Sequence, residues 1–158
     1  MNTERHALKL NVGFLINQQI GTFRDFHFEF PHLTIDEDLA VSELSGVARI
    51  SRTPQGLLVH GVFDVSVEAT CVRCLSDFKQ PLHAEFDELY AFHLHQATES
   101  GLLVPEDGKI DIASVLRDYL LVEVPISPLC QPDCKGLCPV CGADLNQETC
   151  EHQLDHSE

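Results

Sequence analysis

The 158-residue sequence predicts an α+β fold: a mainly antiparallel β domain with one packed helix, followed by a cysteine-rich tail. Several segments alternate apolar and polar residues with a period of two, which is typical of half-buried strands. A later segment shows helical spacing instead, and after about residue 125 prolines and closely spaced cysteines replace both patterns. We therefore expect a β-rich domain at residues 1–125, with its helix at about 111–123, and a tail at residues 126–158.

The first strands are expected in the N-terminal third. Residues 8–15 (LKLNVGFL) alternate weakly, as a strand would. Residues 23–30 (FRDFHFEF) alternate more clearly and place three phenylalanines on one face. Pro31 is expected to end this strand, and the acidic residues 34–40 are expected to form a loop.

The clearest strand pattern surrounds the tetrapeptide TPQG at residues 53–56. Proline suits the second place of a type I turn and glycine the fourth, so two strands are expected to meet there. The second of these strands has an apolar face that ends at Cys71. This face comprises Val59, Phe63, Val65, Val67 and Ala69.

Alternation resumes after the motif CVRC, at residues 82–92. Cys71 and Cys74 are therefore expected in the turn between two strands. Such a turn aims two sulfur atoms at one point, as in a zinc knuckle. The carboxylates of Glu85, Asp87 and Glu88 are most simply the solvated face of the second strand.

The helix is expected after an acidic loop at residues 96–109. Asp111 is a plausible N-cap for the segment IASVLRDYLLVEV, and Pro125 stops the helix. The apolar residues of this segment recur at helical spacing. They are Ile112, Val115, Leu116, Tyr119 and Leu120.

The composition is strongly acidic, with 25 Asp and Glu against 10 Lys and Arg and a formal net charge of -15. Nucleic-acid binding is driven mainly by cations that displace phosphate counterions, and this chain has no block of Lys or Arg. Direct binding to nucleic acid is therefore disfavoured, whereas a basic protein partner is favoured.

The start MNTERHALKL lacks the pattern of a signal peptide, and no apolar run approaches the length of a membrane span. We expect a cytoplasmic protein without a membrane partner.

The seven cysteines are best explained as metal ligands. The cytosol keeps thiols reduced, and an odd number does not suit a framework of disulfides. Pairs two to four residues apart each supply two corners of a tetrahedral zinc site. We expect two structural zinc ions. The preferred ligands are Cys71, Cys74, Cys130 and Cys134 for one ion, and Cys138, Cys141, Cys150 and His152 for the other.

Other arrangements fit the same residues. One zinc ion could be held by Cys130, Cys134, Cys138 and Cys141 alone, and His156 could replace His152. Disulfides or inert thiols are further alternatives. A short tail has little core of its own, so structural zinc would supply its missing folding free energy.

The sequence contains no Walker loop, no G-x-S-x-G elbow and no G-x-G-x-x-G, so we expect no enzymatic activity. The alternative function that the cysteines allow is a thiol redox switch, in which the C-x-x-C motifs release zinc and form disulfides. This function requires exposed thiolates of low pKa.

The order of motifs resembles the YceD family. CVRCL is followed by an acidic loop, by KIDIASVLRDYLLVEVP, and then by PLCQPDCKGLCPVCGADLN with Cys150 close behind. The resemblance runs from about Cys71 to Cys150. Many members end the motif with C-x-C, whereas this chain has Cys150-Glu151-His152; histidine is itself a competent zinc ligand.

The resemblance implies a non-enzymatic factor needed for large ribosomal subunit biogenesis and for accumulation of 23S ribosomal RNA. The family is also associated with a small protein of the large ribosomal subunit. Since the charge disfavours a direct contact with RNA, we expect the partner to be a basic ribosomal protein or a large-subunit assembly intermediate.

Overall fold

The computed structural model describes residues 7–152. The chain forms two compact units, of which the first is Met1–Ser66 with Pro81–Glu123 and the second is Val67–Gln80 with Val124–Glu158. The elements are β1 (Lys9–Asn11), α1 (Gly13–Ile16), β2 (Phe23–Ile35), β3 (Leu39–Arg52), β4 (Gly56–Thr70), β5 (Asp77–Ala91), the 3-10 turn η2 (Leu94–Gln96), β6 (Lys109–Asp111) and α2 (Ala113–Glu123).

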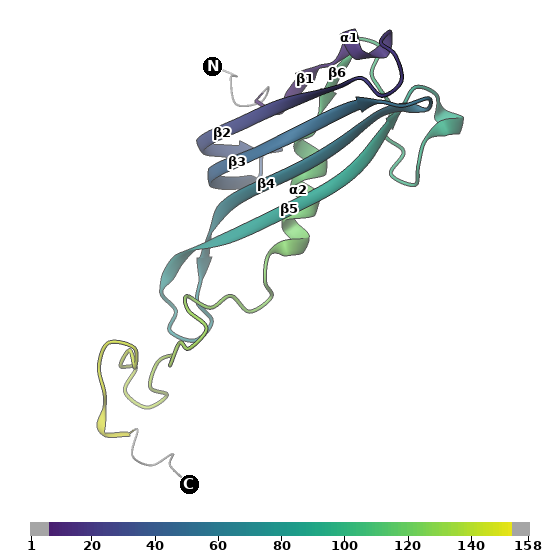
Figure 1. The fold of residues 1–158 in the computed structure, drawn as a ribbon. Coiled ribbons are helices and arrows are strands. Elements are labelled where there is room, and N and C mark those ends of the chain that lie inside the picture. Colours follow the sequence, from purple (N-terminus) through teal and green to yellow (C-terminus); the bar gives the residue numbers. More distant parts are fainter. Residues whose placement is uncertain (1–6, 153–158) are drawn as a thin grey trace. The chain divides into compact units, whose positions relative to one another are not determined.

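A four-stranded sheet in the order β2-β3-β4-β5 forms the main element of the fold (Figure 1). The strand β3 pairs antiparallel with β2 on one side and with β4 on the other. The predicted turn joins β3 to β4, and the Thr53 N–H donates a hydrogen bond of 2.9 Å to the Gly56 carbonyl. This sheet and the helix α2 confirm the predicted α+β class.

Pro31 does not end its strand, contrary to the sequence prediction. The strand β2 continues to Ile35, with Phe30 opposite Leu44 and His32 opposite Ser42. Because β2 is an edge strand, the missing N–H of proline is tolerated there. The other edge strand, β5, also contains a proline, Pro81. The expected loop at residues 34–40 is correspondingly shorter, because Ile35 and Leu39 already pair across the turn.

A second, two-stranded sheet pairs β1 with β6, with Leu10 opposite Ile110. Each strand has three residues, too few for alternation to be recognised, and β6 was not expected from the sequence. The weak strand pattern at residues 8–15 corresponds to β1 followed by the short helix α1.

The helix α2 packs against the four-stranded sheet through the apolar residues that the sequence places on one side. The Asp111 carboxylate accepts a 2.9 Å hydrogen bond from the Ala113 N–H, as an N-terminal capping group does. The Tyr119 ring stacks on Phe86 with 5.0 Å between ring centroids. Ile112, Leu116 and Leu120 are fully buried. No helix among residues 7–152 is long and apolar enough to cross a membrane.

Gly61 makes room for the aromatic core of the sheet. A Cβ at this position would lie 2.6 Å from Cζ of Phe86 and 3.0 Å from Cε2 of Phe63. These two rings are stacked with 6.2 Å between their centroids, and Phe86 continues the stack to α2. The absence of a side chain at Gly61 therefore allows the sheet and α2 to share one core.

We predict that Gly61→Ala lowers the free energy of unfolding by roughly 1–3 kcal/mol, because the added methyl group must displace the Phe86 ring from Tyr119. Urea denaturation followed by far-UV circular dichroism measures this change. The control is Ser45→Ala at an exposed position of β3, expected within about 0.5 kcal/mol of wild type. Equal stability of the two variants would contradict this explanation of Gly61.

Candidate metal centre

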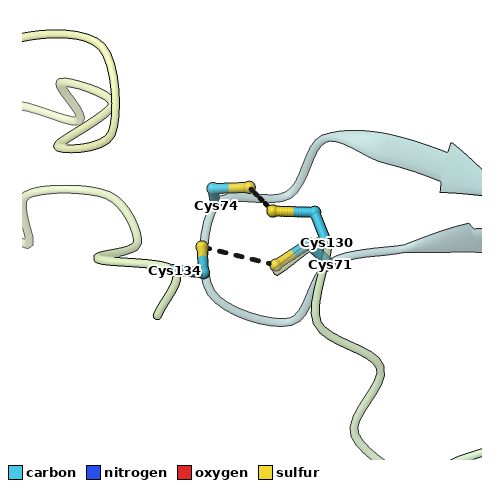
Figure 2. A group of neighbouring side chains, drawn as sticks. All are labelled: Cys71, Cys74, Cys130 and Cys134. Atoms are coloured by element: carbon cyan, nitrogen blue, oxygen red, sulfur yellow. Dashed lines mark hydrogen bonds between the residues drawn. The ribbon is translucent and has the colours of Figure 1, made fainter. Parts of the chain in front are cut away.

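Four cysteines of the second unit come together at the turn between β4 and β5 (Figure 2). Cys71 and Cys74 lie in this turn, and Cys130 and Cys134 lie in the irregular segment after α2. Their sulfur atoms are all within 4.8 Å of one another. We call these four residues the first group.

The sulfur spacings in the first group suit one tetrahedral metal ion. The Sγ atoms of Cys74 and Cys130 are 3.6 Å apart, and those of Cys71 and Cys134 are 3.7 Å apart. Four sulfurs at the usual zinc–sulfur distance are separated by about 3.8 Å from one another. A disulfide would need a separation of about 2.0 Å. The donor set therefore fits a soft divalent metal better than a disulfide framework.

Cys138, Cys141, Cys150 and His152 form the second group, again with one ligand atom of each within 4.8 Å of the others. The Nδ1 atom of His152 is buried and has no hydrogen-bond partner among the described residues. A buried polar atom normally has a partner, and a metal ion would supply one here. The second group thus also fits a metal ion, through three sulfurs and one imidazole nitrogen.

Both C-x-x-C turns have the same backbone conformation. The N–H that follows the second cysteine donates to the carbonyl of the first cysteine, from Leu75 to Cys71 and from Gly142 to Cys138, at 2.9 Å in each case. The N–H of each first cysteine donates back, at 2.9 and 2.8 Å, to the second residue after the motif. Leu75 and Gly142 both have positive φ, 60° and 75°. The two turns are therefore structurally equivalent knuckles.

The knuckle backbone favours the thiolate form of its first cysteine. The backbone N–H of Cys74 faces the Cys71 sulfur and lowers the pKa of that thiol. The backbone N–H groups of Cys141 and Val140 lower the pKa of the Cys138 thiol in the same way. Metal binding requires thiolates, so this backbone geometry would favour metal binding at Cys71 and Cys138.

Burial raises the thiol pKa of one other cysteine in each group, Cys130 in the first and Cys150 in the second. Desolvation raises the pKa of the Cys130 thiol to about 12, and desolvation also raises the pKa of the Cys150 thiol. Thiols of raised pKa give up their protons when a metal ion binds. Each group therefore combines one cysteine whose thiol pKa is lowered with one whose thiol pKa is raised, and a metal ion would have to displace the proton of the second.

Further polar groups contact the sulfurs and carbonyls of the first group. The Ser76 hydroxyl lies 2.8 Å from the Cys74 sulfur, and the Asn146 side-chain NH₂ donates to the Cys134 sulfur at 3.3 Å. The Arg73 guanidinium donates to the Cys134 carbonyl at 2.9 Å. Such contacts orient ligands and offset the negative charge of thiolates.

All eight predicted ligands thus lie in the two groups of four that the sequence analysis preferred, and the one-ion arrangement of Cys130, Cys134, Cys138 and Cys141 is divided between the groups. Their role as metal ligands stays a prediction. His156 lies outside the described residues. The contacts of Ser76 and Asn146 have no recognisable spacing and were not foreseen.

Because the two knuckles are equivalent, substitutions at their residues of positive φ should differ in effect: Gly142→Ala should destabilise its knuckle, whereas Leu75→Gly should not. Gly142→Ala should reduce the local free energy of opening by about 1 kcal/mol, because a Cβ is strained at positive φ. Leu75→Gly should change this free energy by less than about 0.5 kcal/mol, since relief of strain offsets the greater backbone entropy of glycine. Hydrogen exchange of peptides from the second unit measures both effects, and an equal loss in both variants would refute the equivalence.

The family model described as "Large ribosomal RNA subunit accumulation protein YceD" matches residues 59–158, which include both cysteine groups. No solved structure is significantly similar to the chain.

Relatives come from bacteria and plants. An uncharacterized protein of Mycobacterium tuberculosis is 34% identical over 106 residues, which are 63% of this chain and 50% of that protein. The uncharacterized protein YlbN of Bacillus subtilis is 29% identical over 90 residues, 54% of this chain and 52% of that protein. A protein of Arabidopsis thaliana named "Large ribosomal RNA subunit accumulation protein YCED homolog 1, chloroplastic" is 43% identical over 47 residues, 30% of this chain and 15% of that protein. The alignment with the mycobacterial relative thus spans half the length of that protein.

Because the family model matches well over half of the chain, the chain belongs to the YceD family of large ribosomal RNA subunit accumulation proteins.

Proposed function

We propose that this chain is a non-enzymatic, zinc-binding factor in large ribosomal subunit biogenesis, needed for the accumulation of 23S ribosomal RNA in the cytoplasm. The observation that carries the proposal is the family match over residues 59–158, the part of the chain that holds both four-ligand groups. The names of the plant relatives refer to the accumulation of large-subunit ribosomal RNA and to the chloroplast.

The two metal ions would be structural zinc. Sites with four protein ligands are closed, whereas catalytic zinc keeps one position open for water. The buried cluster of the second unit consists of Cys71, Cys74 and Cys134, with Phe78, Leu129 and Leu137 partly buried around it. So small an apolar cluster leaves metal coordination to stabilise the fold.

The partner would be a basic ribosomal or assembly protein. Several of the few cations are already engaged within the chain: Arg49 makes two hydrogen bonds to Asp25, and Arg117 makes two to Asp38. Arginines held in this way have less freedom to neutralise phosphates. Together with the net charge of -15, these pairs favour a basic surface over RNA.

The redox-switch alternative is disfavoured because four of the seven cysteines are buried, including Cys71 and Cys138, whose thiols have a lowered pKa, although Cys141 is exposed. Reactive thiolates have to be accessible to an oxidant. Cys71 is completely buried, and Cys134 and Cys138 are 2% and 4% exposed. A ligand role for these sulfurs requires no access from solvent.

We predict that the purified wild-type chain contains about two zinc ions and that Cys71→Ser and Cys150→Ser each retain about one, because each variant removes one corner of a different tetrahedron. Elemental analysis of the purified proteins measures the stoichiometry. Thr149→Ala, at an exposed position next to Cys150, is the matched control and should keep both ions. Retention of two ions by Cys71→Ser would exclude Cys71 as a necessary ligand.

The proposed partner predicts that ribosomal proteins stay associated with the tagged chain when a lysate is treated with nuclease. Contacts between an acidic chain and a basic protein do not require RNA, but they weaken as salt screens them. Affinity purification with and without nuclease, at low and high ionic strength, measures this association. If nuclease removes every ribosomal protein, the association runs through RNA and the proposed partner is wrong.

A further inference from the structure

Asn146 connects the loop of the second group to a sulfur of the first group. It lies between Cys141 and Cys150 in sequence, yet its side-chain NH₂ donates to Sγ of Cys134 at 3.3 Å. Its side-chain carbonyl accepts hydrogen bonds from the Lys135 N–H at 2.9 Å and from the Gln131 amide at 3.1 Å. One side chain from the loop between Cys141 and Cys150 thus contacts the segment that carries Cys130 and Cys134.

The orientation of the Asn146 amide is fixed by these contacts. A backbone N–H is always a donor, so the atom that faces the Lys135 N–H has to be the carbonyl oxygen. The NH₂ group is then directed to the Cys134 sulfur and to the Asp144 carboxylate, which it contacts at 3.0 Å. Although Asn146 is an exposed residue, both of its donors and both lone pairs of its oxygen are used.

The position of Asn146 depends on the second knuckle. The Cys138 N–H donates to the Ala143 carbonyl at 2.8 Å, and the Leu145 N–H donates to the Gly136 carbonyl at 3.0 Å. Leu137 and Asp144 form an antiparallel bridge between these bonds. This short ladder starts at a ligand of the second group and ends one residue before Asn146.

Four thiolates around one divalent ion leave an excess of two negative charges, and hydrogen-bond donors to the sulfurs stabilise that excess. We propose that Asn146 is a positioning residue that couples the two metal sites: a metal ion in the second group orders the knuckle, holds the Asn146 amide against Cys134 and so raises the metal affinity of the first group. The inference rests on the proposed metal binding. By linkage, occupation of the first group strengthens the second group by the same factor.

Cobalt titration of the reduced, metal-free full-length chain tests the coupling. Four thiolates and three thiolates with one imidazole give different cobalt absorption spectra, so the two groups can be followed separately. Asn146→Ala should lower the cobalt affinity of the first group about tenfold. It should also move the sulfur-to-cobalt charge-transfer band of that group to lower energy, because the sulfur loses a donor. A purely structural role would not move this band.

Two further variants answer two questions. One is whether the NH₂ donor of Asn146 is itself needed, and the other is whether its effect on the first group requires the second group. Asn146→Asp keeps an acceptor for the Lys135 N–H but cannot donate to sulfur, and its carboxylate adds a negative charge beside Cys134 and Asp144, so it should lower the first-group affinity at least as much as Asn146→Ala does. In a chain that lacks the second group (Cys141→Ser with Cys150→Ser), Asn146→Ala should change the first-group affinity by less than about twofold. Gln147→Ala, at the next exposed position, is the control and should match wild type.

The outcomes distinguish this inference from the proposed function. Two bound ions with unchanged affinity in both Asn146 variants would refute the role of Asn146 and leave the metal sites intact. An equal loss with and without the second group would show a local contact and refute the coupling. A wild-type chain that binds no cobalt and no zinc would overturn the proposed metal binding and this inference together.

Discussion

The convergence of cysteine sulfurs is the constraint on which the second unit depends. Its two parts, residues 67–80 and 124–158, are separated by more than forty residues in sequence. The buried cluster that brings them together is composed of cysteines rather than of large apolar side chains. Bringing distant segments together costs loop-closure entropy, and a small cluster of thiols returns little by hydrophobic burial alone. Metal–sulfur bonds would be far stronger than this burial.

The features that could be predicted from the sequence are those whose pattern lies within a few neighbouring residues. The hairpin at residues 53–56, the apolar face of α2 and the close pairs of cysteines rest on short-range spacing, which a single sequence displays; which pairs come together does not. The continuation of β2 through Pro31 was not predictable, because tolerance of proline depends on the strand being at an edge. The strand β6 was missed because three residues show no period.

The contacts around the first and second groups could not be predicted for a related reason. A glycine such as Gly142 suggests a turn with positive φ. Leu75 has the same left-handed conformation in the first knuckle, but a leucine gives no sign of it in the sequence. Asn146 contacts Cys134 across twelve positions in sequence. Such contacts are set by the path of the chain after folding, so residue type and spacing do not reveal them. They also show why the two knuckles are best considered together: the loop of one contributes to the surroundings of the other.

The prolines of the sheet have a consequence for association. The two outermost strands, β2 and β5, each contain one, Pro31 and Pro81. A proline offers no N–H to a strand added alongside, and natural sheets use this property to prevent edge-to-edge aggregation. Two copies of the chain are therefore poorly suited to join their sheets into one continuous sheet. A cell could then accumulate this acidic, strand-rich protein with less risk of fibril formation.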